Sequence, residues 1–394
     1  MERAALVGGL TATQRFNAPG AIALGSVWIE GYDGLAQLES EWRELFRCAN
    51  PENAFLTFGW MSTWWKHFGK GELAVIAVRD ASGRLAALAP FYITRTATAL
   101  GARRLGFLAD THVGSDYLGI LAAPGLAQPA AAEIARALLA QRKRWDYIEL
   151  RDTADSPLLE DLIAHLAQSG LHPQKAPGQI CYYISLPPQF SQYLSAICIG
   201  PRANFRRRWR NLQRDHQGEC VTFAGAEELQ QHFAVLLRLH RLRFEQRKMA
   251  SAFLAPAVPE FHSDVLQQLA AEGLARLLLL KADGQPVAAL YGFSAGKTFQ
   301  FYQSGFDPQW LRHGMGQVII GKAIENAIAG GHTTFDFLRG GEPYKAQWAQ
   351  QSRQTVSWRL FDHRYASLAA QLEMRVSRAL HGAARIIPAK RRGV

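Results

Sequence analysis

Two glycines separated by one residue stand at the start of a helix-like run in the last third of the chain. The segment before them, Thr298–Ser304, is strand-like, and apolar residues recur near a 3.6-residue period after them. A strand, a Gly-x-Gly turn and a helix N-terminus direct unpaired backbone N–H groups and the positive end of a helix dipole to one point. That point suits a phosphate group. In the alternative interpretation, Gly314 and Gly316 only let the chain turn before the helix.

The residues around this turn form the candidate cofactor-binding set. Strand Thr298–Ser304 can offer backbone groups to a ligand, and Gly305 is the expected place of a bulge where strand pairing stops. The set comprises Gln303, Ser304, Gly305, Arg312, His313, Gly314, Met315, Gly316 and Gln317.

Positive charge is concentrated in two places. The chain has a formal net charge of +11, which implies an anionic partner such as a phosphorylated cofactor, a nucleic acid or a membrane surface. A solvated helix face is the alternative interpretation for the first of the two clusters. The clusters are Arg202, Arg206, Arg207, Arg208, Arg210 and Arg214 near the middle, and Lys390, Arg391 and Arg392 at the end.

Cysteine and histidine spacing argues against a metal centre. The four cysteines are scattered without a Cys-x-x-Cys pair, and the histidines form no His-x-x-x-His pair. We therefore expect no metal and a reducing, cytoplasmic location. Apolar runs are shorter than the roughly 20 residues that span a bilayer. Residues 1–26 are expected to form a flexible leader.

Strand-like and helix-like runs alternate through two halves of the 394-residue chain. This alternation predicts an α/β protein with mixed sheets, and Tyr117–Leu121 is one of the expected strands. Pro187-Pro188 would interrupt a strand ladder, so we place a boundary there. The expected domains are residues 27–188 and 189–365, followed by a basic helix or tail over residues 366–394.

The two halves echo one another. Val78–Leu88 resembles Leu280–Leu290, and each hairpin leads through a helix to a similar strand, Trp145–Ile148 in one half and Phe335–Leu338 in the other. This pattern indicates an internal duplication of one α/β unit. The first copy has only Gly125 before its helix, so the double-glycine turn belongs to the second copy alone.

Four stretches carry a resemblance to a known family. They are Phe55–Trp60, Ser115–Leu118, Tyr302–Pro308 and Asp336–Lys345. Over residues 27–365 the chain resembles the tandem GNAT acetyltransferases of the CelD, or cellulose-biosynthesis, group, which are relatives of the Fem aminoacyltransferases. The resemblance implies two GNAT-like domains in tandem. It also implies acetyl-CoA or another acyl-CoA as co-substrate, with its pyrophosphate on the Gly314–Gly316 turn.

Acyl transfer needs a base for the nucleophile and an acid for the leaving thiolate. The resemblance implies that Tyr344 is the acid and that Lys345 stabilises charge, as in the Fem aromatic-Lys-x-x-aromatic pattern. Asp336 and Glu342 are the nearest carboxylates and are candidate bases. The plainer alternatives are a buried ring for Tyr344, a solvated Lys345, and an Asp336 paired with Arg339.

The acceptor side is expected in the first unit. Asp116 and Tyr117 resemble the family's acceptor-side pair, and His112 lies four residues before Asp116. We therefore expect Asp116, Tyr117, His112 and Arg339 to contact the acceptor. A turn-capping role for Asp116 is the alternative.

These observations favour acetyl transfer from acetyl-CoA to an amine or hydroxyl of a sugar or polysaccharide precursor. Two alternatives stay open. The first is a Fem-like aminoacyltransferase that binds charged tRNA through Arg202–Arg214. The second is an inactive scaffold in exopolysaccharide assembly. The basic end of the chain would suit an anionic surface such as the inner membrane.

Overall fold

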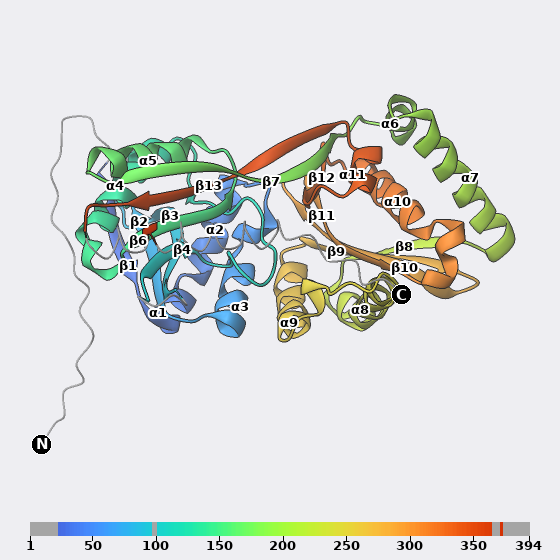
Figure 1. Cartoon of the computed structure of the whole chain (residues 1–394), viewed down its shortest axis with the longest axis horizontal. Coiled ribbons are helices and arrows are strands. Elements are labelled where there is room, and N and C mark those ends of the chain that lie inside the picture. Colours follow the sequence, from blue (N-terminus) through green and yellow to red (C-terminus); the bar gives the residue numbers. More distant parts are fainter. Residues whose placement is uncertain (1–22, 97–100, 365–370, 373–394) are drawn as a thin grey trace, which may run out of the picture.

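The computed structural model describes residues 23–96, 101–364 and 371–372. The expected leader lies mostly outside the described residues, and so does the expected basic helix or tail over residues 366–394. In the described residues the fold is mixed α/β, as the sequence predicted, with two similar units along one sheet (Figure 1).

The first unit begins with an antiparallel ladder and ends in a long strand. Its strands are β1 (Gly25–Ile29), β2 (Glu72–Arg79), β3 (Leu85–Arg95), β4 (Arg103–Phe107), β5 (Leu121–Ala122), β6 (Tyr147–Thr153) and β7 (His172–Ser185). Its helices are α1 (Gly31–Gln37), α2 (Glu39–Ala49), α3 (Phe58–Phe68), α4 (Ala127–Ala140) and α5 (Pro157–Gln168), with 3₁₀ turns η1 (Ala54–Leu56) and η2 (Arg142–Arg144). Nearly every residue of β2 and β3 is buried, because both faces of these strands are covered.

The second unit repeats this plan. Its strands are β8 (Glu219–Phe223), β9 (Ala275–Ala282), β10 (Gln285–Ala295), β11 (Thr298–Phe306), β12 (Thr334–Arg339) and β13 (Gln351–Phe361). Its helices are α6 (Phe190–Ala196), α7 (Ile199–His216), α8 (Ala226–Gln246), α9 (Val258–Ala271), α10 (Met315–Ala329) and α11 (Pro343–Trp348), with η3 (Ala252–Leu254) and η4 (Pro308–His313). Helices α8 and α9 lie on one side of the sheet, and α7 and α10 lie on the other (Figure 1).

The units exchange their last strands. The sheet order is β1-β2-β3-β4-β6-β13-β7-β12-β11-β10-β9-β8. Strand β13 of the second half therefore lies between β6 and β7, while the C-terminal end of β7 pairs with β12. In Figure 1 these two strands bridge the lobes. The expected boundary at Pro187-Pro188 follows β7 directly, and the domain limits stay a prediction.

In each unit two neighbouring parallel strands pair over a short length and then separate. Strands β11 and β12 pair only from Thr298 to Gln300, and beyond that point β11 has a free edge. Strands β4 and β6 pair over a similarly short length, at Arg104 and Leu105. In the first unit Arg104 occupies this region as a buried ion pair, with its Nη1 2.5 Å from Asp110 Oδ2. In the second unit, the space between β11 and β12 beyond Gln300 stays open, and we call it the gap.

Two local expectations were wrong. The bulge on β11 falls at Tyr302, because Gln303 pairs with Tyr291 while Phe301 pairs with Gly292. Gly305 instead lets α8 approach β11, since a Cβ there would overlap the backbone of His240. The expected strand Tyr117–Leu121 is mostly loop: Tyr117 has a φ of 56°, and Leu118 forms only an isolated bridge with Thr153.

Candidate functional site

The gap between β11 and β12 opens into two cavities. The first, which we call the inter-unit cavity, has a volume of about 190 Å³ and is lined from the first unit by the loop around His112–Asp116. The second, the Gly-loop cavity, has a volume of about 300 Å³ and lies at the N-terminus of α10. Three residues line both cavities: Arg243, Ser304 and Tyr344. The two spaces therefore meet at these side chains.

The Gly-loop cavity is built to hold negative charge. Gly314 has a φ of 67° and precedes α10, and a Cβ there would overlap the guanidinium of Arg208. The amides of Gln317 and Val318 already donate to the Gly314 carbonyl. Met315 and Gly316 thus provide the N–H groups of the first helical turn that a ligand can reach. The turn predicted from the sequence lies in this cavity.

Three arginines from two helices add positive charge at the same place. Arg208 comes from α7 and donates to the Gln317 side chain, while Arg243 lies in the last turn of α8 and Arg247 is the C-cap of that helix. Guanidinium groups bind phosphate through fixed, paired donors. The sequence indicated Arg208 only as one of a cluster and did not indicate Arg243 and Arg247 at the end of α8. Their four-residue spacing on an amphipathic helix was the available signal.

Four of the nine predicted cofactor residues do not line this cavity: Gln303, Gly305, Arg312 and His313. Arg312 and His313 belong to η4 and are exposed. His313 packs against the rings of Trp310 and His216. Arg208, from a helix about a hundred residues earlier, fills the place expected of Arg312. Gln303 lines the inter-unit cavity.

At the meeting point, α8 is tied to β11. Arg243 Nη1 donates to the Ser304 carbonyl at 3.1 Å and to its Oγ at 2.9 Å. His240 Nδ1 lies 2.9 Å from the same carbonyl, and burial lowers the pKa of His240 to about 4. Burial also raises the pKa of Tyr344 to about 12, with Glu342 adding to the shift and Arg243 opposing it. Tyr344 is therefore protonated at neutral pH, as an acid must be.

Lys345 is buried, contrary to the solvated alternative. Its side chain is 5% exposed, and its Nζ donates to the Arg339 carbonyl at 2.6 Å and lies 3.0 Å from Glu342 Oε2. The Glu342 side chain is 53% exposed. Both residues line the inter-unit cavity with Tyr344. Three of the four predicted catalytic residues thus come together.

Asp336, the fourth, lies behind the cavity. It is fully buried and forms an ion pair with Arg353 of β13. The Tyr117 hydroxyl donates to it at 3.1 Å, and the Leu338 amide donates at 2.7 Å. Asp336 therefore pairs with Arg353 and not with Arg339, the partner that the sequence alternative named. With its oxygens bonded in this way it is poorly placed to act as a base.

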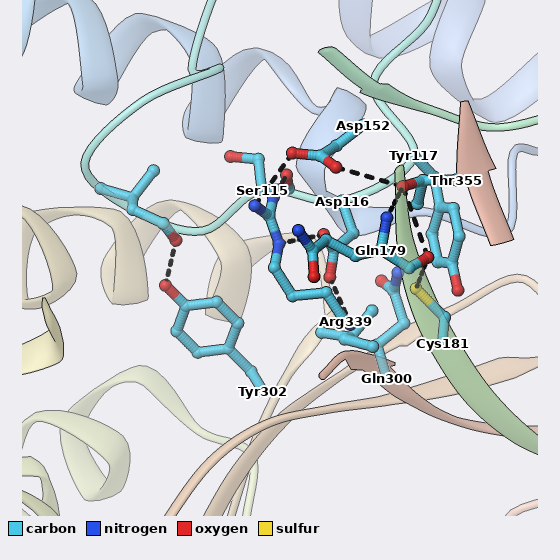
Figure 2. A network of polar contacts seen from close by, with 12 residues as sticks. Ser115, Asp116, Tyr117, Asp152, Gln179, Cys181, Gln300, Tyr302, Arg339 and Thr355 are labelled. Carbon is cyan, nitrogen blue, oxygen red and sulfur yellow. Dashed lines mark hydrogen bonds and ion pairs between the residues drawn. The ribbon is translucent and has the colours of Figure 1, made fainter. Parts of the chain in front are cut away.

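Arg339 connects the two units through a buried polar network (Figure 2). Its Nε and backbone N–H donate to Asp116, and its Nη1 donates to Asp152 at 3.0 Å. Burial raises the pKa of Asp116 to about 6, although Arg339 opposes that shift. Asp116 and Arg339 both line the inter-unit cavity, and so does His112, whose ring stacks on Phe68. Tyr117 packs beneath Arg353 instead.

Metal ligands are not grouped in the part of the chain that the structure describes: no set of three or more His, Cys, Asp or Glu side chains could hold an ion. Among the same residues, none of the helices combines the length and apolar character needed to cross a membrane.

Comparison with known protein families finds a match to part of the chain. The family described as "Acetyltransferase (GNAT) domain" matches residues 201–346, which contain the Gly-loop cavity. Residues 201–346 are thus similar to an acyltransferase domain of the GNAT type. No curated protein sequence matches the chain.

Solved structures share the fold at low sequence identity. FemX is 11% identical with a TM-score of 0.58, and the match covers 80% of this chain and 95% of FemX. L-PGS from Bacillus licheniformis is 14% identical with a TM-score of 0.50, covering 86% of this chain and 95% of that one. A Bacteroides thetaiotaomicron protein of unknown function is 12% identical with a TM-score of 0.52, covering 83% and 96%.

Proposed function

We propose that this protein transfers an acyl group, in the simplest case acetyl, from an acyl-CoA to an amine or hydroxyl of a saccharide acceptor. One observation carries the proposal: a cavity with three arginines and a helix N-terminus meets a second polar cavity at Tyr344. The first suits the phosphates of coenzyme A, and the second suits the acceptor. The link to an exopolysaccharide precursor depends on the resemblance to the CelD group.

In this mechanism Glu342 acts as the base and Tyr344 acts as the acid. The acceptor nitrogen or oxygen forms a bond to the acyl carbon, and the carbon–sulfur bond breaks. The Glu342 carboxylate receives the acceptor's proton, and the Tyr344 hydroxyl gives its proton to the departing thiolate. Lys345 holds Glu342 and the end of β12 in place. Asp336 and Arg353 support the same strand from behind.

Calorimetric titration with coenzyme A tests the donor site. Arg208→Ala and Arg247→Ala should each weaken binding about tenfold, which corresponds to about 1.4 kcal/mol for a lost phosphate contact. Arg206→Ala is the matched control, because Arg206 is exposed on the same helix and lies outside the cavity lining. Equal weakening by all three substitutions would mean that general positive charge, and not this cavity, attracts the ligand.

A second candidate is aminoacyl transfer from charged tRNA. It is favoured by the likeness of fold to FemX and by the exposed side chains of Arg206, Arg207 and Arg210 on α7, the helix that carries Arg208. Replacing these three by alanine should reduce the salt dependence of tRNA binding by about three phosphate contacts. Coenzyme A binding should be unaffected. Charged tRNA that binds no better to the parent protein than to the triple variant would rule out this candidate.

A further inference from the structure

We propose that Arg243 binds the carbonyl oxygen of the acyl group and stabilises the negative charge that develops on it during transfer. This inference rests on the proposed function, because it assumes that a thioester occupies the Gly-loop cavity. It adds to that function a residue that neither the sequence patterns nor the resemblance indicated.

The position of Arg243 follows from the two cavities. A thioester whose phosphates lie near Gly314 and Arg208 must present its acyl carbon where an acceptor can reach it. Only the boundary between the cavities is open to both sides. Arg243, Ser304 and Tyr344 form that boundary.

The guanidinium is held in place and still has donor capacity. Its Nη1 is fixed by the Ser304 carbonyl and hydroxyl, and the planar group lies over the Phe306 ring at 5.6 Å. Its Nε is buried and has no hydrogen-bond partner among the described residues. The rest of the guanidinium lines both cavities, so a ligand oxygen can accept from it while Nη1 keeps its bonds to Ser304. A fixed donor that needs no reorganisation is what stabilises an oxyanion.

Neighbouring groups are already engaged. Lys345 donates to main-chain carbonyls and pairs with Glu342. Arg339 is bound to Asp116 and Asp152. Ser304 Oγ accepts from Arg243 itself. Of Lys345, Arg339 and Arg243, Arg243 is the one that lines both cavities.

Isotope-edited infrared spectroscopy of bound acetyl-CoA labelled with ¹³C at the carbonyl tests this directly, without a known acceptor. A guanidinium donor polarises the carbonyl and lowers its stretching frequency relative to free acetyl-CoA. Arg243→Gln should return the band to the free position, and Arg243→Lys should retain part of the shift. Arg247→Ala is the control: it should weaken binding about tenfold and leave the bound frequency unchanged.

The outcomes separate this inference from the proposed function. If the parent protein does not bind acetyl-CoA, the proposed donor fails and the role of Arg243 fails with it. If acetyl-CoA binds but the band is unshifted, or is shifted equally in Arg243→Gln, the donor stands and the role of Arg243 is wrong. If Arg243→Gln loses affinity alone while its bound band stays shifted, Arg243 is a phosphate ligand. Melting curves of both Arg243 variants show whether they fold.

Discussion

Asp336 and Asp116 are both fully buried, and an arginine from another segment holds each of them. The sequence identified the carboxylates but not their partners, because Arg353 and Arg339 meet them only through strand pairing and the loop between units. Because Asp336 is held in an ion pair with Arg353, it is poorly placed to act as a base, and the half-exposed Glu342 is the remaining candidate. Tyr344 is set apart differently, since burial raises its pKa and keeps it protonated.

Buried histidines should make the protein sensitive to acid. Burial lowers the pKa of His240 to about 4 and that of His262 to about 3. Both stay neutral in the folded state while the unfolded chain binds protons below its ordinary value of about 6.5, so the free energy of unfolding falls as the pH drops. Asp116 opposes this, because its raised pKa, about 6, makes the folded state bind a proton first. Between pH 6 and 4 the unfolded state should therefore bind about one proton more than the folded state. The free energy of unfolding should then fall by about 1.4 kcal/mol for each pH unit of acidification.

Urea unfolding at a series of pH values measures that slope. His262→Phe fills the same aromatic pocket and should remove most of the dependence, whatever it does to the absolute stability. His172→Gln, at an exposed position on β7, should leave the slope as it is. An unchanged slope in His262→Phe would show that His262 is not the source of the acid sensitivity.

Helix α8 shows what apolar periodicity predicts and what it does not. The periodicity predicts a helix over Ala226–Arg247, and the observed helix is Ala226–Gln246. Apolar periodicity gives the face that packs on the sheet, but not which polar residue reaches a strand edge. Similarly, the hairpin β2–β3 followed from its turn residues, whereas the loop before β5 did not. That loop is fixed by Asp116 and Ser115 contacting Arg339, more than two hundred residues away.

Gly305→Ala tests how closely α8 must approach β11. The added Cβ would overlap the backbone of His240 and push the helix outward. We expect a loss of about 1–3 kcal/mol in the free energy of unfolding, as for other overpacked sites. Because His240 and Arg243 would lose the Ser304 carbonyl, acyl-CoA binding should weaken too.

The control for this variant is Gly119→Ala. An added Cβ at Gly119 has nothing within 4 Å, so neither stability nor binding should change. Gly305→Ala with normal stability and binding would mean that α8 moves without cost, and that its contact with Ser304 is dispensable.

At the scale of the whole molecule, duplication was readable from the sequence and strand exchange was not. The similar hairpins revealed two copies of one unit because each is a local feature. The partners of β7 and β13 depend on pairings between residues that are far apart in the chain, such as Trp358 with Leu150. The exchange places both halves of the network in Figure 2 on one continuous sheet. The gap that forms the site is therefore supported from both units.

This arrangement predicts that a substitution that disrupts β13 should destabilise strands of the first unit. Val356 of β13 pairs with Thr153 of β6 and with Pro177 of β7. Val356→Pro removes a ladder donor from a central strand, so amide hydrogen exchange should accelerate in β6, about two hundred residues earlier in the chain. Val221→Pro in β8 is the control, because β8 pairs only with β9 and lies at the far edge. It should accelerate exchange in β9 and leave β6 protected. If Val356→Pro instead affected only β7 and β12, the units would be stable independently, and the shared sheet would not hold the site together.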